Sequence, residues 1–265
     1  MRAHEVIAYN RAAEHENKVH DPEFARAAGF RGGIVPGVDV YAYMTRPVVE
    51  ELGVGWLRRG GFEARFTSPV YDADRLQVEA ERLDDGRLLV TVTNDAAETC
   101  ATGIAEETAG EAPDTASFPA AELPERRLEA TPESISTRPL FGSIEMEIDD
   151  ADARRHLEEV REELSVYARE RIAHPGHLLR AADAIIAANI ELPPWMHVGS
   201  RVRFFDLVRW GDRLSVRARL IDLFEKKRHR FVRLDVLLLR RDQPVMRVEP
   251  YTAIYRPAFL DRVAG

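Results

Sequence analysis

The sequence repeats one pattern at a fixed distance. Residues 75–80 read RLQVEA, and residues 213–218, which lie 138 positions further along, read RLSVRA. An Arg-Phe pair returns at the same spacing, first at 65–66 and then at 203–204. Unrelated segments rarely keep a shared pattern in register over such a length, so we predict that the chain consists of two copies of one structural unit.

Both copies carry the same expected order of elements. A Pro-Gly pair opens an apolar segment in each, and we predict helices over 38–52 and 175–189 that are buried nearly all round. Alternating apolar and polar residues follow each helix and predict strands of antiparallel sheet with one covered face. These strands are expected at 62–66, 75–83, 87–94 and 98–105 in the first copy, and at 196–205, 213–224, 229–240 and 244–255 in the second.

A helix wrapped by a long antiparallel sheet is the hotdog arrangement, so the two copies predict an α+β fold of the double hotdog type. The expected units span 1–106 and 135–265. Between them, residues 107–134 are rich in Ala, Pro and Glu and lack apolar periodicity, which is typical of a linker. Because fusion replaces the pairing that single copies obtain by dimerising, we expect one or two sites between the halves and a chain that is a monomer or a homodimer.

Composition narrows the classes of function. With 37 Lys and Arg against 45 Asp and Glu, the net charge of −8 argues against a general binder of nucleic acid or of anionic membranes. The single cysteine, Cys100, provides neither an internal disulfide nor a Cys-based zinc site. No apolar run approaches the roughly 20 residues of a membrane span, and the first residues lack the apolar stretch of a signal peptide. Small molecules and protein partners remain as ligands, and we expect a cytoplasmic protein.

The stretch before the first helix carries a motif. Residues 17–25 read NKVHDPEFA, Gly29-Phe30 follows, and residues 32–37 (GGIVPG) lead into the helix. This motif resembles that of the MaoC-like dehydratase and (R)-specific enoyl-CoA hydratase family. The resemblance implies a double hotdog lyase, a hydratase or dehydratase that adds or removes water at the α,β bond of an acyl thioester, without a cofactor. Its partner would be a small-molecule substrate, with linkage to CoA or to a carrier protein as one alternative.

The same resemblance assigns roles to four positions. His20 would be the acid or base, Asn17 its polar support, and the amides of Gly37 and Val38 the donors to the thioester oxygen. The chemistry is coherent, because a weakly acidic proton near a carbonyl needs a positioned base, and the developing charge needs a preorganised donor. A helix N-terminus offers unpaired N–H groups and a favourable dipole.

The sequence departs from the family pattern at His15, which stands where the family has its catalytic Asp. Several replacements stay open, because the carboxylates of Glu14, Glu16, Asp21 and Asp39 are all close in sequence to the proposed pocket. Glu16 lies four residues before His20 and would share a face with it if the segment were helical. His15 itself is a further alternative, because imidazole titrates near neutrality and can act as an acid or a base.

Further candidates lie at the helices and at one strand. Tyr41 is expected to line the cleft, and His174, Gly176 and His177 are expected to bind substrate at the start of the second helix. His197 is expected on the strand face that carries Arg201 and Arg203. No spacing among the eight histidines is diagnostic of a metal site, so no metal is expected.

Two charged segments have alternative interpretations. Residues 150–172 predict one amphipathic helix, which either packs over the sheet edge or acts as a lid over the cleft. Residues 225–230 (EKKRHR) predict a solvated hairpin tip. In the alternative interpretation, this basic tip docks the phosphates of CoA or of a phosphopantetheine arm.

Other functions fit the same fold. A hotdog thioesterase, or a lyase or cyclase that acts on a secondary-metabolite intermediate, would use the same cleft with different chemistry. A non-catalytic protein that binds an acyl group or another small ligand would need only an apolar cavity. Catalysis instead needs His20 within reach of a helix N-terminus and of a second proton-transfer group.

Overall fold

The computed structural model describes residues 2–108, 110–257 and 259–260. Its main sheet contains β1 (Arg2–Ile7), β2 (Gly61–Phe66), β3 (Arg75–Arg82), β4 (Leu88–Asn94), β5 (Thr99–Glu106), β7 (Ile144–Glu147), β9 (Met196–Phe204), β10 (Arg213–Lys226), β11 (His229–Arg240) and β12 (Gln243–Arg256). The helices are α1 (Pro22–Ala27), α2 (Gly37–Leu52), α3 (Trp56–Arg59), α4 (Pro132–Ser136), α5 (Asp150–Glu159), α6 (Ser165–Glu170) and α7 (Pro175–Asn189). The two-residue strands β6 (Leu128–Glu129) and β8 (Ile190–Glu191) form a separate parallel pair, and residues 18–20 and 115–117 form short 3-10 turns.

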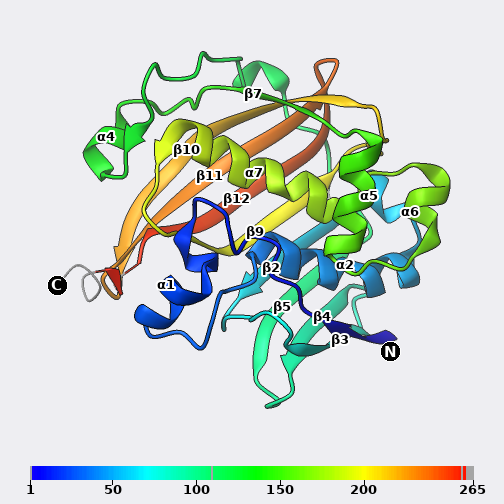
Figure 1. Cartoon of the computed structure of the whole chain (residues 1–265). Coiled ribbons are helices and arrows are strands. Elements are labelled where there is room, and N and C mark those ends of the chain that lie inside the picture. The colour runs from blue at the N-terminus through cyan, green and yellow to red at the C-terminus, as the bar shows by residue number, and fades with distance from the viewer. Residues whose placement is uncertain (1, 109, 258, 261–265) are drawn as a thin grey trace.

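The main sheet is antiparallel throughout and curves around the two long helices (Figure 1). Its strand order is β1-β3-β4-β5-β2-β9-β12-β11-β10-β7. The predicted α+β double hotdog is confirmed, with both long helices and all eight expected strands in place and their ends displaced by at most two residues.

The two halves meet where β2 pairs with β9. Arg65 lies opposite Gly199, and Gly61 lies opposite Arg203. These two strands carry the repeated Arg-Phe pair, so equivalent strands of the two copies form the central pair of one continuous sheet.

Helices α2 and α7 pack against each other inside the curve of the sheet (Figure 1). Both are buried over most of their length. At one close contact between them, a Cβ atom added at Gly176 would lie only 2.6 Å from the Cβ of Ala42. The second helix can therefore begin beside the first only because residue 176 has no side chain.

The segment 150–172 differs from the prediction of one helix, because it forms α5 and α6 with a break between them. Arg161 adopts a left-handed φ of 54° in the break. The carboxylate of Glu162 turns inward and accepts a hydrogen bond of 2.7 Å from the N–H of Leu164, immediately before α6. This local side-chain contact competes with the helical hydrogen bonds, which explains why the apolar stripe did not give a single helix.

Residues 107–134 include the second 3-10 turn and β6. Phe118 packs on Leu237 and Leu239, and the Arg217 guanidinium donates a hydrogen bond of 2.9 Å to the Phe118 carbonyl. The segment therefore crosses β10 and β11 rather than extending into solvent. The unit boundaries at 106 and 135 stay a prediction.

Candidate active site between the halves

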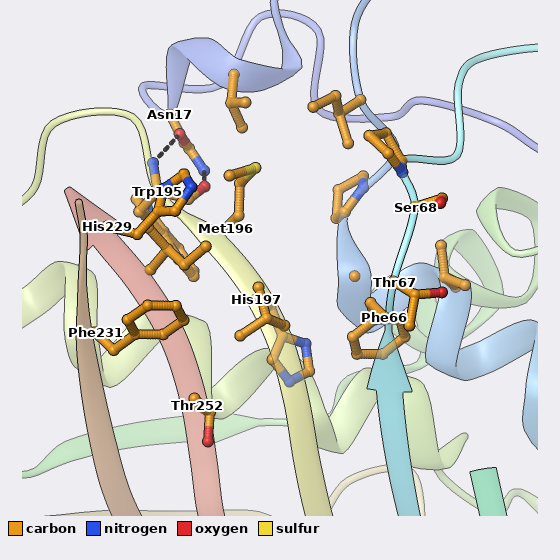
Figure 2. A pocket seen from close by; sticks show the side chains of 18 of the residues that line it. Asn17, Phe66, Thr67, Ser68, Trp195, Met196, His197, His229, Phe231 and Thr252 are labelled. Carbon is orange, nitrogen blue, oxygen red and sulfur yellow. Dashed lines mark hydrogen bonds between the residues drawn. The ribbon is translucent and has the colours of Figure 1, made fainter. Parts of the chain in front are cut away.

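A cavity of about 790 Å³ lies beside the start of α2 and between the two halves. In Figure 2, Asn17, Trp195 and Met196 lie on one side, and Phe66, Thr67 and Ser68 lie on the other. The wall is largely apolar. Its polar members include Asn17, His20, Thr67, Ser68, Asp183, His197 and Thr252.

The start of α2 opens into this cavity. Pro36 precedes the helix and provides no side-chain cap, and its carbonyl accepts hydrogen bonds from the N–H groups of Asp39 and Val40. The N–H groups of Gly37 and Val38 have no partner among the described residues, as expected for the first turn of a helix. Only Gly37 lines the cavity, so its N–H is the better-placed donor.

Gly37 is needed because β9 approaches the helix closely. A Cβ atom added at residue 37 would lie 3.1 Å from the His197 carbonyl oxygen and 3.2 Å from its ring Nδ1. These distances are shorter than ordinary contacts, so any side chain here would push β9 and the His197 ring away from the helix.

His20 is buried, and protein groups contact both of its ring nitrogens. Its Nδ1 lies 2.6 Å from the carbonyl oxygen of Ile34, and a carbonyl only accepts, so Nδ1 carries the proton. Its Nε2 lies 3.2 Å from the side-chain nitrogen of Asn17, which therefore donates to the Nε2 lone pair. Burial lowers the pKa of His20 to about 4. The ring is thus a neutral acceptor at its cavity end.

Asn17 is fixed by the backbone of Trp195, as the dashed lines in Figure 2 show. Its side-chain nitrogen donates to the Trp195 carbonyl at 2.9 Å, and its oxygen accepts from the Trp195 N–H at 3.1 Å. This pair of bonds prevents the amide from flipping, so Asn17 can only donate toward His20. If His20 were protonated, its Nε2–H would face the Asn17 NH2 group, which cannot accept a hydrogen bond. The neutral imidazole is therefore favoured further.

Asp183, on α7 of the second half, provides a carboxyl group to the same cavity. One side of the residue faces the cavity, and protein surrounds the rest. Burial raises the pKa of Asp183 to about 7, although the hydrogen bond that its carboxylate accepts from the Tyr251 hydroxyl lowers this pKa. A carboxyl group with such a pKa can give or take a proton near neutral pH.

His197 joins this group from β9. Its ring stacks on Tyr251 at 4.4 Å and contacts Phe66 at 4.9 Å, measured between ring centroids. Burial lowers the pKa of His197 to about 3, and neither ring nitrogen forms a hydrogen bond of normal geometry with another described residue. His197 is therefore a neutral, polar wall of the cavity next to Gly37.

The expectation that His197 shares a face with Arg201 and Arg203 is wrong. The pairing of β9 with β12 shifts between Gly199 and His197, so the alternation of faces reverses within the strand. Gly199 was the available signal, because glycine inside a strand often marks a bulge. Asp183 was missed because it lies in an Ala-rich helix that otherwise reads as core.

The other residues proposed from the sequence lie elsewhere. His15 and Glu16 are exposed and do not line the cavity; Glu16 lies 3.5 Å from Arg127. The Nδ1 of His15 accepts the Asn17 N–H at 3.1 Å, so His15 shapes the loop from outside. Val38 and Tyr41 are fully buried in the core and do not line the cavity either.

The histidines at the start of α7 form a separate buried cluster. The Nδ1 of His174 accepts the N–H of Gly176 at 3.1 Å and lies 3.2 Å from Nε2 of His156. The His156 ring stacks on His177 at 4.8 Å, and Glu162 lies 3.4 Å from Nε2 of His174. Helix α5 thus covers the start of α7, and His174, Gly176 and His177 do not line the cavity. Within the described part of the chain, no group of His, Cys, Asp and Glu side chains is arranged to hold a metal ion.

Comparison with known families assigns the first half of the chain. Residues 5–100 match the model of the MaoC like domain, which covers the His20 loop, α2 and most of the four strands that follow. This region is a MaoC-like domain. The sequence resemblance is therefore confirmed for the half that carries His20 and Gly37. No curated protein gives a significant match.

Solved structures resemble the whole chain. A MaoC domain protein from Chloroflexus aurantiacus J-10-fl is 12% identical with a TM-score of 0.64, and the match covers 97% of this chain and 95% of that one. A conserved hypothetical protein from Mycobacterium tuberculosis, which has a double hotdog fold, is 13% identical with a TM-score of 0.61 over 96% and 95% of the two chains. A bifunctional dehydratase-cyclase domain in ambruticin biosynthesis is 17% identical, with a TM-score of 0.52 over 99% and 93%. At these identities, the likeness establishes the double hotdog fold alone.

No helix in the described ranges has both the length and the apolar content that a membrane span requires.

Proposed function

We propose that this MaoC-like protein is a hydro-lyase that adds water to, or removes water from, the α,β bond of an acyl thioester. The observation that carries the proposal is a carboxyl group with a pKa of about 7, Asp183, in the same cavity as Gly37 and the neutral His20. Asp183 takes the place of the carboxylate that His15 leaves missing from the first half.

Each group has a distinct part in hydration. The Nε2 lone pair of His20 exchanges the long contact from Asn17 for a hydrogen bond from the reacting water. The Asp183 carboxylate takes a proton from this water as its oxygen bonds to the β carbon. The resulting carboxylic acid then gives this proton to the α carbon, so the water is consumed completely. The Gly37 N–H donates to the thioester oxygen while negative charge develops there.

Dehydration follows the same steps in reverse. Asp183 removes the α proton as carboxylate and returns a proton to the leaving hydroxyl group. Because one residue serves both steps, its pKa must lie near the working pH in both directions, as the value of about 7 provides. The apolar remainder of the cavity wall accommodates the acyl chain and excludes further water.

The test is incubation with crotonyl-CoA and longer enoyl-CoAs, in which loss of the conjugated-thioester absorbance and release of free thiol are followed in parallel. Asp183→Asn is expected to lower the hydration rate about 10²- to 10⁴-fold, the usual contribution of a positioned acid or base. His20→Ala is expected to lower it by a smaller factor, because His20 orients the water and does not transfer the proton. Asp84→Asn, in an exposed turn, is the matched control.

The two readouts separate the alternatives. Loss of the conjugated-thioester absorbance without thiol release supports the hydro-lyase, provided that Asp183→Asn abolishes this loss and the control Asp84→Asn does not. Thiol release would identify a thioesterase instead. Unchanged hydration by the Asp183→Asn protein would refute the role of this carboxyl group.

A further inference from the structure

One buried carboxylate close to the cavity has no part in the proposed reaction. Asp39 stands in the first turn of α2, two residues after Gly37, but it does not line the cavity. Its Oδ1 accepts hydrogen bonds of 3.1 and 2.8 Å from Nε and Nη2 of Arg180. Its Oδ2 accepts one of 2.9 Å from Nε of Arg11. Guanidinium groups occupy both oxygens, so Asp39 is not free to act as the acid or base of the reaction.

The bond between Asp39 and Arg180 fixes the register of the two long helices. At the start of α7, Gly176 packs against Ala42 on α2. One turn further along α7, Arg180 binds Asp39, which stands nearly one turn back along α2. The helices therefore run antiparallel here. Asp183 lies three residues beyond Arg180 on the same face of α7, so this register brings Asp183 beside the start of α2.

The second arginine connects Asp39 to the loop that carries His20. Arg11 precedes this loop, and its neighbour Asn10 is bonded to the loop directly. The Asn10 side chain donates to the His20 carbonyl at 2.8 Å and accepts the N–H of Ala12 at 3.1 Å. A shift of Arg11 would therefore move Asn10 and, with it, the backbone of His20.

Glu159 on α5 is a second anion for the same two arginines. Its Oε2 lies 2.9 Å from Nη1 of Arg180 and 3.7 Å from Nε of Arg11. The side chain of Glu159 is 20% exposed, against 2% for Asp39, and α5 lies outside the cavity lining. Of the two carboxylates, Asp39 is therefore the one that lies between the segments carrying the reacting groups.

We propose that Asp39 is a positioning residue of the active site. Through its own helix and its two arginines, it holds three groups in one arrangement: the ring of His20, the N–H of Gly37 and the carboxyl group of Asp183. The proposal rests on the proposed function, because that function makes these three the reacting groups. A displacement of about 1 Å between reacting groups can lower a rate about 100-fold, so a contact shared by all three segments affects kcat directly.

The charge of Asp39 also acts on Asp183. Burial is the main reason that the pKa of Asp183 is raised, to about 7, and the hydrogen bond from Tyr251 lowers it. The positive charges of Arg11 and Arg180 lower this pKa as well, whereas the negative charge of Asp39 raises it. If Asp39 became neutral, the two arginines would remain, so the pKa of Asp183 should fall.

The test compares Asp39→Asn with Glu159→Gln, the matched control that neutralises the second anion of the same arginines. With crotonyl-CoA as substrate, we expect Asp39→Asn to lower kcat for hydration about 100-fold. KM should stay nearly unchanged, because Asp39 is not part of the cavity wall. Glu159→Gln should keep both constants close to those of the wild type.

Arg180→Lys is the second variant, for the case that Asp39→Asn does not fold. It keeps the positive charge but cannot form both of the bonds that the guanidinium donates to Oδ1 of Asp39. We expect it to lower kcat about tenfold at an unchanged KM, since the contact between the helices is loosened and not removed.

Two measurements on the free protein do not depend on turnover. Carbon NMR of the carboxyl groups follows the pKa of Asp183, whose signal is identified by its absence in Asp183→Asn. Nitrogen NMR of the imidazole follows the contact at Nε2 of His20. In Asp39→Asn we expect the pKa of Asp183 to fall and the Nε2 signal to move, and in Glu159→Gln we expect both to stay in place.

The outcomes separate this proposal from the proposed function. A wild-type kcat in Asp39→Asn would overturn the positioning role, and so would equal losses in Asp39→Asn and Glu159→Gln, because either anion would then serve equally well. If the wild type hydrates no enoyl thioester, the proposed reaction is refuted and the two NMR measurements decide about Asp39. Signals that are unchanged in Asp39→Asn would overturn its role, and signals displaced there but not in Glu159→Gln would support it.

Discussion

The two halves present the same structural feature, the start of a long buried helix, in opposite states. At α2, Gly37 faces the cavity, and its N–H has no partner among the described residues. At α7, the His174 side chain accepts the N–H of Gly176, and His156 on α5 covers the site. A donor that could polarise a substrate carbonyl is free in one half and is already used in the other.

This difference shows how a duplicated fold can support one site instead of two. The helix of each half supplies something different to the single cavity. The first supplies the amide of Gly37, and the second supplies a carboxyl group, Asp183, from two turns further along α7. The start of α7 can be filled with packed histidines because the second half contributes through the middle of its helix.

The comparison predicts a large stability cost for opening the covered helix start. His156→Ala removes a fully buried ring that stacks on His177 and contacts His174. We expect the free energy of unfolding to fall by about 3 kcal/mol, as for the truncation of other buried rings. Urea unfolding measures the change, and Glu158→Gln, exposed on the same helix, is the control. If the free energy of unfolding falls no further in His156→Ala than in Glu158→Gln, α5 does not pack tightly on α7.

Acid should weaken the fold through the same cluster. Burial lowers the pKa of His177 to about 3, from an ordinary value of 6.5, so the unfolded chain binds a proton more readily. The stabilisation by neutral His177 is therefore complete above pH 6.5 and is lost as the pH falls from 6.5 toward 3. The loss is about 1 kcal/mol per pH unit for this one group.

The corresponding experiment follows the urea midpoint at about pH 7, 6 and 5. His177→Asn is expected to be less stable near neutrality but to lose less of its stability on acidification. His197→Asn tests the open helix start in the same manner, because burial lowers the pKa of His197 to about 3 as well. Parallel pH profiles of wild type and both variants would contradict this origin of the acid sensitivity.

Two glycine substitutions are expected to affect different properties. Gly176→Ala places a Cβ atom 2.6 Å from that of Ala42, so the helices must separate and stability should fall by about 1 to 3 kcal/mol. Gly37→Ala meets softer contacts of 3.1 to 3.2 Å with His197, so the fold should persist while hydration slows about tenfold through displacement of that ring. Denaturant unfolding and the enoyl-CoA assay on both variants check this. Equal loss of activity in the two would remove the functional distinction between the helix starts.

Much of this fold could be predicted because the repeat fixes the element order twice. The Pro-Gly helix starts and the alternating strand patterns occur in both copies, so the pattern of each copy supports the elements predicted for the other. The break at Arg161 was not predictable from periodicity, because it depends on the inward turn of one carboxylate, Glu162.

Less of the site than of the fold could be predicted from the sequence. The motif before α2 led to His20, Asn17 and Gly37, which do line the cavity. Asp183 carries no local signal, since its environment is created by Tyr251, 68 residues later in the chain, and by the packing of α7 against the other half. Its raised pKa is a property of tertiary burial, which no motif of neighbouring residues records.

The smallest expected effect concerns the tuning of Asp183. The Tyr251 hydroxyl donates to the Asp183 carboxylate and so lowers a pKa that burial raises. In Tyr251→Phe this donor is lost, and the carboxylate, the form that takes the proton in hydration, should appear only at higher pH. A hydrogen bond to a charged group corresponds to a shift of about one pH unit. The pH dependence of kcat/KM for hydration should therefore move upward by that amount.

Tyr41→Phe is the matched control for this shift, because the Tyr41 hydroxyl is buried without a hydrogen-bonding partner among the described residues. Its pH profile should coincide with that of the wild type. If Tyr251→Phe also leaves the midpoint in place, Asp183 is not the group whose ionisation limits the reaction. A group other than Asp183 would then have to transfer the proton beside the start of α2. His20 is the titratable residue of the first half that lines the cavity, so it would be the next candidate.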